Sequence, residues 1–366
     1  MLTRLYIDNF RCFEKFEWKP GRKQLILGRN GTGKSSLMDA LRFVCQVAVF
    51  GDRLEDWFKQ HERARWVDQR QQIFEIEARL KSGVFVYRLL IEPSDEPARS
   101  VVRSETVDLD NHRIFAFENG EVFPRGSGSG VGYKWDQTRT ALSTISSQSA
   151  GQDLLEFRGW LSRVRCWHIN PVQMEALTGE EHVFTRADMR DMAAWYKHLV
   201  RIHPKTSNEA LQDDLRRSLD GFSRLYFEPV GENVDVLYAE FLRESGRIRI
   251  SLAELSDGQR YLICLYAIIH FVVAKGGTVI IDEPDNFISL REIQPWLMRI
   301  EEIADDNKGQ VILISHHPEI LNQWANPYGV QFVRHGAGPV LVEKFKGDPE
   351  GSLTAAEVVA EGWDFD

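Results

Sequence analysis

A glycine-rich segment near the start of the chain has the residue types and spacing that bind phosphate. Gly28–Ser35 reads G-R-N-G-T-G-K-S and lies between the apolar run Gln24–Leu27 and a helix expected over Lys34–Phe50. Backbone N–H groups of such a turn and of the helix N-terminus point at phosphate oxygens. Lys34 adds positive charge toward the β and γ phosphates, and Ser35 can hold Mg²⁺. The remaining residues expected to bind a nucleoside triphosphate here are Asn30, Gly31, Gly33 and Ser36.

Two adjacent carboxylates close an apolar run later in the chain. Thr278–Glu283 reads T-V-I-I-D-E. Asp282 can hold the Mg²⁺ shell while Glu283 polarises an attacking water, and phosphoryl transfer needs both roles. A strand that merely ends in an Asp-Glu cap would show the same pattern. The pair of carboxylates therefore indicates phosphoryl transfer only together with the other motifs.

Two further motifs lie at an expected helix start and an expected strand end. Leu255–Arg260 reads L-S-D-G-Q-R and precedes a long apolar helix, which Ser256 can cap. The N–H groups of Ser256 and Gly258 there can also bind an anion. Ile314–Pro318 reads I-S-H-H-P and follows an apolar strand. A histidine at a strand end is otherwise a structural or surface residue.

These motifs need strands and helices that position them. After Gly246 short strands alternate with helices, which is typical of an α/β fold. The expected elements are Ile248–Leu252, Gly258–Ala274, Thr278–Ile281, Leu290–Ala304 and Gln310–Ser315. The strands T-V-I-I and V-I-L-I are continuously apolar, as parallel strands covered on both faces are. At the start of the chain, Leu2–Phe16 and Gln24–Leu27 are predicted as strands around a turn at Pro20 and Gly21.

The middle of the chain is predicted to be inserted into this α/β core. Gln72–Phe123 alternates in short runs, which favours an antiparallel meander. Arg125–Tyr133 is dense in Gly and Ser and cannot bury much surface, whereas Arg186–Leu225 has apolar residues at helical spacing. The expected organisation is a core over 1–50 and 246–346, a β lobe over 51–125, a flexible loop over 126–152, a helical insert over 153–245 and an acidic tail over 347–366.

The composition excludes several classes of protein. A hydrophobic content of 43% excludes a disordered or collagenous chain. Tyr261–Ala274 is too short for a bilayer span, which needs about 20 apolar residues, and Met1–Phe10 has no secretory pattern. We therefore expect a cytoplasmic protein without a membrane partner. Four scattered cysteines without a CxxC pair fit reduced thiols in such a compartment. They are Cys12, Cys45, Cys166 and Cys264.

Taken together and in this order, the four motifs resemble those of ABC-type ATPases. L-S-D-G-Q resembles the family signature L-S-G-G-Q and departs from it at Asp257, while His316 matches the switch histidine better than His317 does. The resemblance implies an ABC-type ATPase head that uses ATP and Mg²⁺, with Lys34, Glu283 and His316 as its catalytic residues. It also implies a homodimer that sandwiches two nucleotides. In that dimer each nucleotide site is shared between two subunits. One subunit contributes Ser256, Gly258 and Gln259, and the other contributes Lys34, Ser35, Asp282 and Glu283. Asp285 and Asn286 lie between the two sites.

Two segments indicate a branch of that family. Leu2–Phe13 resembles the first strand of SMC, RecF and OLD-type ATPases, which implies that Asn9 and Arg11 contact the nucleotide. Asp282–Leu297 resembles the compact, RecF-like AAA_21-type predicted ATPases of prokaryotic defence and DNA-maintenance operons. The family's Q-loop glutamine stays open between Gln148 and Gln152. We expect no long coiled-coil arm and no TOPRIM nuclease on this chain, so that any nuclease effector would be a separate subunit.

A nucleic-acid surface on this chain would have to be local. The net charge is −9, from 54 acidic and 45 basic residues. Arginines interleaved with tryptophans can bind phosphates and stack bases. The clusters are Arg158, Arg163 and Arg165 with Trp160 and Trp167, then Arg216, Arg217 and Arg224, then Arg243, Arg247 and Arg249. Because Asp213, Asp214 and Asp220 share the second segment, a mixed-charge solvated face is the alternative.

Three functional hypotheses follow. The first is an ATP-hydrolysing dimer that acts in DNA maintenance and repair, or that senses foreign nucleic acid or phage in antiviral defence through a separate effector. The second is an ATP-gated scaffold that holds a nuclease or toxin subunit and turns over slowly. The third, a transporter subunit, is disfavoured because roughly 220 residues separate Lys34 from Leu255, a larger insertion than transporter cassettes have.

Overall fold

A computed structural model describes residues 1–94, 99–118, 120–124, 133–146, 148, 150–203, 205–307 and 309–362. The chain forms two compact units, each built from two stretches of sequence. The first unit contains Met1–Arg165 and Tyr328–Lys346, and the second contains Cys166–Pro327 and Gly347–Asp366. Of the expected Gly/Ser-rich loop, residues 126–132, 147 and 149 lie outside the described residues, as do the last four residues of the acidic tail.

In the first unit, eight of the described strands form one antiparallel sheet in the order β2-β1-β4-β5-β6-β7-β8-β9. The meander predicted over Gln72–Phe123 makes up most of it. Burial alternates along β4, so that one face packs inward. The strands are β1 Leu2–Asp8, β2 Phe16–Trp18, β4 Gln72–Arg79, β5 Val84–Pro93, β6 Ser100–Leu109, β7 His112–Glu118, β8 Glu121–Phe123 and β9 Tyr133–Lys134.

The first strand ends earlier than the predicted Leu2–Phe16, at Asp8. Asn9 and Arg11 adopt left-handed backbone conformations, with φ of 59° and 50°. Asn9 is fully buried, and its amide donates to the carbonyls of Gln69 and Gln71 at 2.7 and 2.8 Å. Asparagine tolerates this conformation better than most residues, so Asn9 turns the chain out of the strand.

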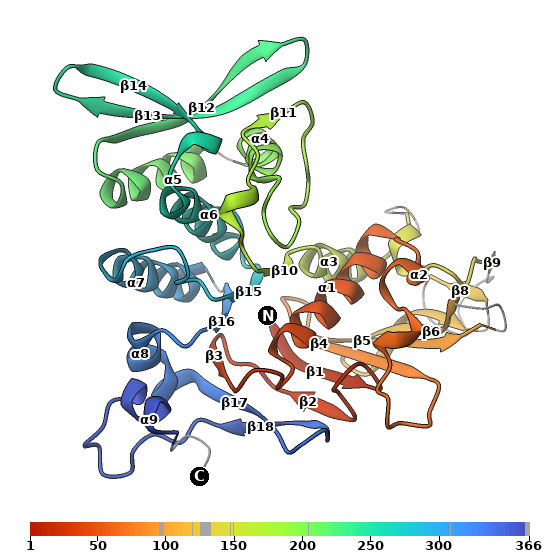
Figure 1. The fold of residues 1–366 in the computed structure, drawn as a ribbon. Coiled ribbons are helices and arrows are strands. Elements are labelled where there is room, and N and C mark those ends of the chain that lie inside the picture. Colours follow the sequence, from red (N-terminus) through yellow and green to blue (C-terminus); the bar gives the residue numbers. More distant parts are fainter. Residues whose placement is uncertain are drawn as a thin grey trace. The chain divides into compact units, whose positions relative to one another are not determined.

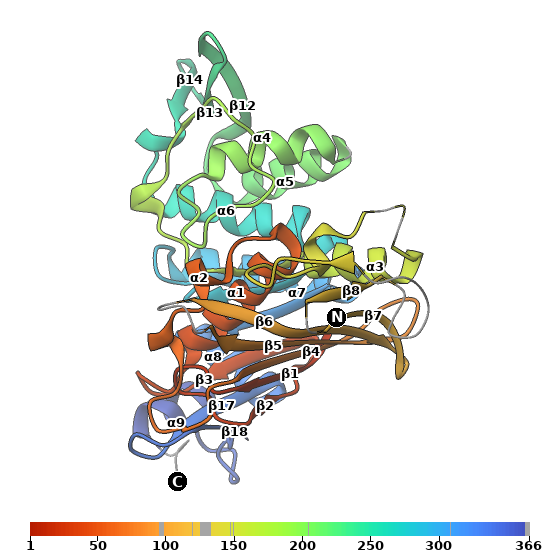
Figure 2. The ribbon, with the colours of Figure 1, turned by 90° about the vertical axis from the view of Figure 1, so that its right-hand side faces the viewer.

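The glycine-rich segment of the first unit lies between β3, Lys23–Leu27, and α1, Lys34–Phe50. β3 pairs in parallel with β17, Gly329–Arg334, which pairs antiparallel with β18, Val340–Lys344. α1 lies against one face of the large sheet (Figure 2), and Phe43 of α1 packs edge-on against Phe10. The remaining helices of this unit are α2 Leu54–Trp57 and α3 Gln152–Leu161, and β10, Val164–Trp167, leads into the second unit.

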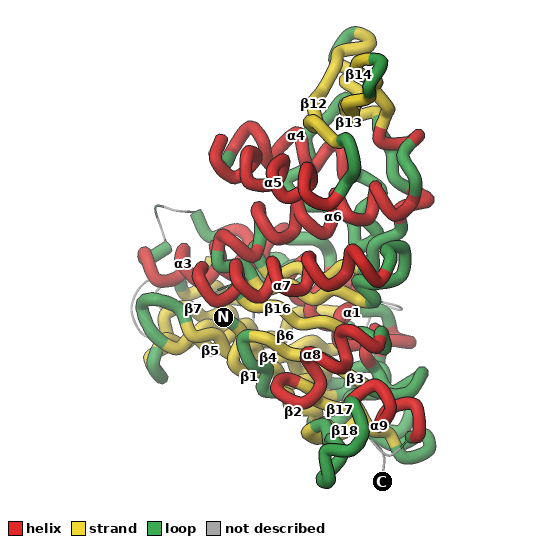
Figure 3. Tube along the Cα trace, turned by 90° about the vertical axis from the view of Figure 1, so that its left-hand side faces the viewer, coloured by secondary structure: helices red, strands yellow, loops and turns green. Residues whose placement is uncertain are grey.

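The second unit has a buried parallel strand pair, β15 Thr278–Asp282 and β16 Gln310–Ile314, as predicted. Helices α5, α6 and α7 lie side by side (Figures 1 and 3). None of the helices in the described part of the chain has the length and apolar character that a membrane crossing requires. The helices are α4 Met192–Ile202, α5 Lys205–Ser218, α6 Asp257–Phe271, α7 Leu290–Asn307, α8 Pro318–Tyr328 and α9 Ala355–Glu361.

The segment expected to be helical over 153–245 also contains strands. The helix predicted to run to Leu225 ends at Ser218, and Gly221, with φ of 72°, turns the chain into a long antiparallel hairpin. Asn233, with φ of 61°, supplies the two-residue hairpin turn between Gly231 and Val234. The sheet contains β11 Leu177–Thr178, β12 Phe222–Gly231, β13 Val234–Arg243 and β14 Gly246–Ser251.

A buried carboxyl group secures the connection that returns from the large sheet of the first unit toward α3. Glu105 of β6 is fully buried, and its side chain accepts hydrogen bonds from the N–H groups of Ala141 and Leu142 at 2.7 and 3.1 Å. The hydroxyl of Tyr87 donates to it at 2.9 Å. Burial raises the pKa of Glu105 to about 7, although these hydrogen bonds favour the charged form.

This raised pKa predicts a pH-dependent stability. Between about pH 4.5 and 7 folded Glu105 holds a proton that the unfolded chain has lost, so the free energy of unfolding falls as pH rises through that window. The steepest fall that one such group can cause is about 1.4 kcal/mol per pH unit. Urea denaturation at pH 5, 6, 7 and 8 should show this loss in the wild type relative to Glu105→Gln. Parallel curves for the two proteins would contradict the assignment.

Candidate nucleotide-binding elements

The glycine-rich loop of the first unit has the backbone form of an anion site. Gly33 is the N-cap of α1, with φ of 97°, and no side-chain hydrogen bond caps this helix. The loop is held by Thr32, whose hydroxyl donates to the carbonyl of Arg29 at 2.8 Å. Lys34 Nζ bends back to the carbonyls of Gly28 and Arg29. The first N–H groups of α1, a helix of 17 residues, are therefore available to an anion at this loop, which also carries the positive charge of Lys34.

Two of the glycines are required by close contacts. A Cβ on Gly28 would lie 2.6 Å from the carbonyl oxygen of Phe332, and a Cβ on Gly33 would lie 2.8 Å from Sγ of Cys12. Both positions also have positive φ. The loop therefore packs directly on β17 and on the turn after β1. Asn30, Gly31 and Ser35 are exposed, and Lys34 and Ser36 are half-buried.

The two residues predicted to contact nucleotide from the first strand are held by protein groups. Arg11 Nη1 donates to Asp39 at 2.6 Å, and its Nε pairs with Glu62. Asn9 Oδ1 accepts from the N–H of Ala64 at 3.1 Å, which completes the bonding of its buried amide. These contacts tie the segment after β1 to α1 and to residues 62–71. A nucleotide contact for either residue stays a prediction.

In the second unit Asp282 ends β15 and Glu283 follows it in a strained conformation. Glu283 has φ of 50°, unusual for a residue other than glycine, and its N–H donates to the carbonyl of Ile314 at 2.8 Å. Tyr261 donates to the carbonyl of Glu283 at 2.7 Å, and Asn286 Nδ2 donates to Glu283 Oε2 at 2.6 Å. The backbone and one carboxylate oxygen of Glu283 are thereby fixed.

A histidine that the sequence analysis missed contacts Asp282. Nδ1 of His168 lies 3.3 Å from Oδ2 of Asp282, and the hydrogen bond between them raises the pKa of His168 against the opposing effect of partial burial. The signal in the sequence was weak, because His168 follows Val164–Trp167, a short segment whose apolar residues are interrupted by Arg165. Of the glutamines considered for the Q-loop, Gln152 begins α3 and Gln148 is exposed, both in the first unit.

The L-S-D-G-Q-R motif lies at the start of α6. Ser256 is the N-cap, and its Oγ accepts from the N–H of Gln259 at 3.3 Å while Gln259 Oε1 accepts from the N–H of Ser256 at 3.1 Å. This reciprocal capping box fixes the helix start. Asp257, the departure from the family signature, pairs with Arg260. A Cβ on Gly258 would lie 2.8 Å from the carbonyl oxygen of Phe287.

The two histidines after β16 differ in their surroundings. His317 Nδ1 accepts from the N–H of Glu319 at 3.3 Å, so this ring helps to form the first turn of α8. His316 is exposed. Ser315, fully buried, donates to Asp285 Oδ1 at 2.6 Å and accepts from the N–H of His317 at 2.9 Å. The segments after β15 and β16 are thus joined through one hydroxyl.

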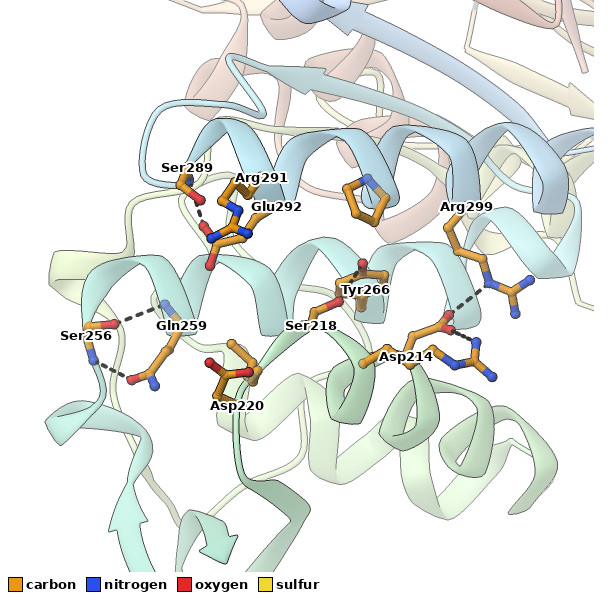
Figure 4. Close-up of a pocket in the computed structure, with 13 residues that line it drawn as sticks. Asp214, Ser218, Asp220, Ser256, Gln259, Tyr266, Ser289, Arg291, Glu292 and Arg299 are labelled. Atoms are coloured by element: carbon orange, nitrogen blue, oxygen red, sulfur yellow. Dashed lines mark hydrogen bonds and ion pairs between the residues drawn. The ribbon is translucent and has the colours of Figure 1, made fainter. Parts of the chain in front are cut away.

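A groove of about 830 Å³ runs along α6 from the signature motif, within the second unit (Figure 4). Its wall is polar and carries both signs of charge. The lining residues are Asp214, Arg217, Ser218, Leu219, Asp220, Ser256, Gln259, Tyr266, Ser289, Arg291, Glu292, Pro295 and Arg299. Burial disfavours the charge of Asp214, but hydrogen bonds from His270 at 2.7 Å and Arg299 at 2.9 Å lower its pKa. This network joins α5, α6 and α7.

The arginine clusters expected to form a nucleic-acid surface are largely paired within the protein. Arg217 joins Asp214 at 3.0 Å, and Arg216 joins Asp213. Arg224 and Arg247 of the clusters pair with Glu240, and Arg249 pairs with Glu228. Arg158 donates to the carbonyls of Ile145 and Ser143 in the first unit. The mixed-charge alternative therefore describes these faces better than a continuous basic patch does.

Comparisons with known proteins identify a family for this chain. A family model described as "AAA domain, putative AbiEii toxin, Type IV TA system" matches residues 25–322. Among curated proteins, no match was found. Two solved structures of SMC heads are similar to this chain. One, from Pyrococcus furiosus, has an extended coiled coil and is bound to the C-terminal domain of ScpA; it is 12% identical, with 100% of this chain and 99% of that chain covered and a TM-score of 0.53.

The other solved structure is the SMC head domain from Thermotoga maritima, at 13% identity, with 94% of this chain and 99% of that chain covered and a TM-score of 0.48. The family model spans most of the present chain, including the glycine-rich loop, the signature motif and the two carboxylates. The chain therefore belongs to this AAA-domain family, and its fold is similar to that of an SMC head.

Proposed function

We propose that this protein binds ATP together with Mg²⁺ and hydrolyses it. The observation that carries the proposal is the loop Gly28–Ser35, in which glycines of positive φ lead into a helix start that no side chain caps. Such a start binds the phosphates of a nucleotide. Asn30, Gly31, Gly33 and Ser36 would supply backbone contacts, and Lys34 would neutralise the β and γ phosphates.

Each of the two proposed donor groups, taken by itself, has the chemistry to bind a magnesium ion. Ser35 offers an exposed hydroxyl, and Asp282 offers a carboxylate at a strand end whose side chain is 14% exposed. Within the described residues, no three His, Cys, Asp or Glu side chains form a closed metal cage. Mg²⁺ is usually held by one or two protein oxygens together with substrate phosphates. When bound, the ion would neutralise charge that develops on the transferred phosphoryl group.

We propose Glu283 as the residue that orients the attacking water. Asn286 occupies its Oε2, and no described residue donates to Oε1, which leaves that oxygen to accept a hydrogen bond from water. His316, exposed after β16, is proposed to contact the γ-phosphate. Tyr261 and Ile314 hold the backbone of Glu283, so its carboxylate need not reorganise during the reaction.

The catalytic state is proposed to be a homodimer. The exposed Ser256, together with Gly258 and Gln259, would bind the nucleotide held by the loop of a second subunit. Two points support this dimer. The family's nucleotide site is shared between subunits, and the N–H groups at the start of α6, at Ser256, can bind an anion. Asp285 and Asn286 would lie near the junction of the two sites.

We propose that the ATP cycle serves DNA maintenance or the sensing of foreign nucleic acid or phage, with a separate effector such as a nuclease. The second candidate is an ATP-gated scaffold that holds such an effector with slow turnover. A specific observation favours this second candidate: carboxylates of the second unit pair with the clustered arginines Arg216, Arg217, Arg224, Arg247 and Arg249. Fewer positive charges then remain to contact DNA phosphates.

Two substitutions should separate ATP binding from hydrolysis. Lys34→Ala should abolish both, because it removes the charge opposite the β and γ phosphates. Glu283→Gln should leave binding intact and slow hydrolysis by about 10² to 10⁴-fold, the usual contribution of a positioned acid–base group. Calorimetric titration with ATP and steady-state phosphate release measure the two effects. Glu244→Gln, in the exposed turn after β13, is the matched control and should resemble the wild type. Normal turnover by Glu283→Gln would contradict its assigned role.

A mixing experiment tests the shared site. Lys34→Ala and Ser256→Arg subunits should each be inactive alone, because each damages both composite sites of its own dimer. Mixed dimers regain one intact site, so phosphate release should recover in part when the variants are combined. Full activity of either variant alone would exclude catalysis across the dimer interface.

Turnover with and without linear double-stranded DNA separates the two candidate roles. A DNA-directed ATPase should be stimulated at moderate salt, and the stimulation should fade as salt rises because counterions are released on binding. A scaffold should show the same slow turnover with and without DNA, and Glu283→Gln should then retain or strengthen its association with the effector.

A further inference from the structure

The sheet that contains β12, β13 and β14 in the second unit has two edges that differ in their surroundings. β13 lies in its middle, with β12 on one side and with β14 and the short β11 on the other (Figure 1). An outermost strand directs every second pair of N–H and C=O groups away from its sheet, and these groups can pair with a further strand. Whether an edge can accept such a strand depends on what already occupies those groups.

The edge formed by β12 is closed by its own unit. Leu225 donates its N–H to Oε1 of Gln212 at 2.8 Å, and the carbonyl of Ser223 accepts from Nε of Arg216 at 2.9 Å. Both of these side chains belong to α5. Farther along the strand, Pro229 has no N–H to donate. Two side chains and a proline therefore leave little of this edge to another strand.

The edge formed by β14 is open at two residues. A two-residue turn joins β13 to β14, so the pair that flanks it, Arg243 and Gly246, is hydrogen-bonded. Bonded pairs then alternate with non-bonded pairs, so Arg247 and Arg249 direct their N–H and C=O groups outward. Ser251, which has the same orientation, donates its N–H to a nearby glutamate side chain at 3.0 Å. Among the described residues, no group bonds to the outward backbone atoms of the two arginines.

The side chains of β14 differ in chemistry between the two faces of the sheet. On one face Arg247 and Arg249 pair with carboxylates of β13 and β12, and their side chains remain 65% and 58% exposed. On the other face Ile248 and Ile250 are half-buried. The open edge therefore presents positive charge on one face and partly exposed apolar surface on the other.

We propose that β14 binds an extended segment of a partner protein as an added antiparallel strand, in which acidic residues alternate with apolar ones. β13 pairs antiparallel with β11, β12 and β14, so an antiparallel addition continues this sheet. Acidic residues of the partner lie opposite Arg247 and Arg249, and the apolar residues between them cover Ile248 and Ile250. Main-chain hydrogen bonds give such a complex its affinity, and the side chains give it specificity.

A second copy of this chain does not fit the open edge. Antiparallel pairing of β14 with itself would place Arg247 and Arg249 of the two copies opposite one another, and like charges in directly opposed positions are destabilising. The same arginines repel a strand with basic residues. Charge at this edge therefore rejects identical and basic strands and favours an acidic one. None of these residues belongs to the proposed ATP site, so the proposal does not rest on ATP hydrolysis.

Calorimetric titration of the full chain with short synthetic peptides tests the proposal. A capped peptide that alternates glutamate with valine should bind, and one that alternates lysine with valine should not. In an antiparallel pair the residues opposite Arg247 and Arg249 direct their own N–H groups at β14. N-methylation of the glutamates should therefore abolish binding. N-methylation of the valines, whose N–H groups lie on the other edge of the peptide, should leave the affinity unchanged.

Substitutions in the protein distinguish the two edges of the sheet. The double variant Arg247→Gln, Arg249→Gln removes both cross-strand charge pairs and should weaken binding of the glutamate peptide about tenfold. Arg224→Gln removes an arginine that also pairs with Glu240 but lies on β12, at the closed edge. This matched control should bind the peptide like the wild type. Circular dichroism of each variant checks that its fold is retained.

The named outcomes either support or overturn the added strand. Equal binding of the peptide with N-methylated glutamates would mean that charge alone attracts it, and strand addition would be wrong. Equal affinity of the double variant and the wild type would overturn the role of Arg247 and Arg249. Absence of binding by the glutamate peptide also overturns the proposal, and binding of a DNA oligonucleotide in its place would assign these arginines to phosphate contacts.

Discussion

The uncapped start of α1 is the constraint on which much of the first unit depends. Gly33, with its positive φ, has no side chain to satisfy the helix N–H groups, so these groups require an anion or water as their partner. The surrounding protein is arranged to hold that unsatisfied end in place. Phe332 packs against Gly28 and Cys12 against Gly33, so β17 and the turn after β1 leave the loop no room for larger residues. The backbone by itself thus gives the loop the form of an anion site, to which side chains can add.

In the second unit, a few hydrogen bonds fix the segments that follow β15 and β16. Ser315 reaches Asp285, Asn286 reaches Glu283, and Tyr261 reaches the carbonyl of Glu283. Each of these bonds uses a residue within a few positions of a family motif. The left-handed backbone at Glu283 carries a cost of about 1–3 kcal/mol, which the neighbouring hydrogen bonds must offset. Strain of this kind is typical of positions where orientation matters more than stability.

Local signals in the sequence predicted the elements that carry motifs. The helix expected over Lys34–Phe50 has these bounds in the structure, because left-handed glycines at 33 and 51 enclose it. β15 and β16 followed from their apolar runs. The hairpin of β12 and β13 was missed because Leu211, Leu215 and Leu219 set a helical period that was extended past Gly221. The contact of His168 with Asp282 could not be predicted, since it unites residues far apart in sequence without a motif of its own.

The contact of Gly258 with Phe287 has a mechanical consequence. Their backbones approach so closely that a single added carbon would lie 2.8 Å from the Phe287 carbonyl, and the rings of Tyr261 and Phe287 are 5.4 Å apart. The first turn of α6 and the segment that follows Glu283 therefore have no space to slide past one another. A displacement of one of these two segments must therefore displace the other. A ligand that displaced the first turn of α6 would therefore also displace the segment that carries Glu283.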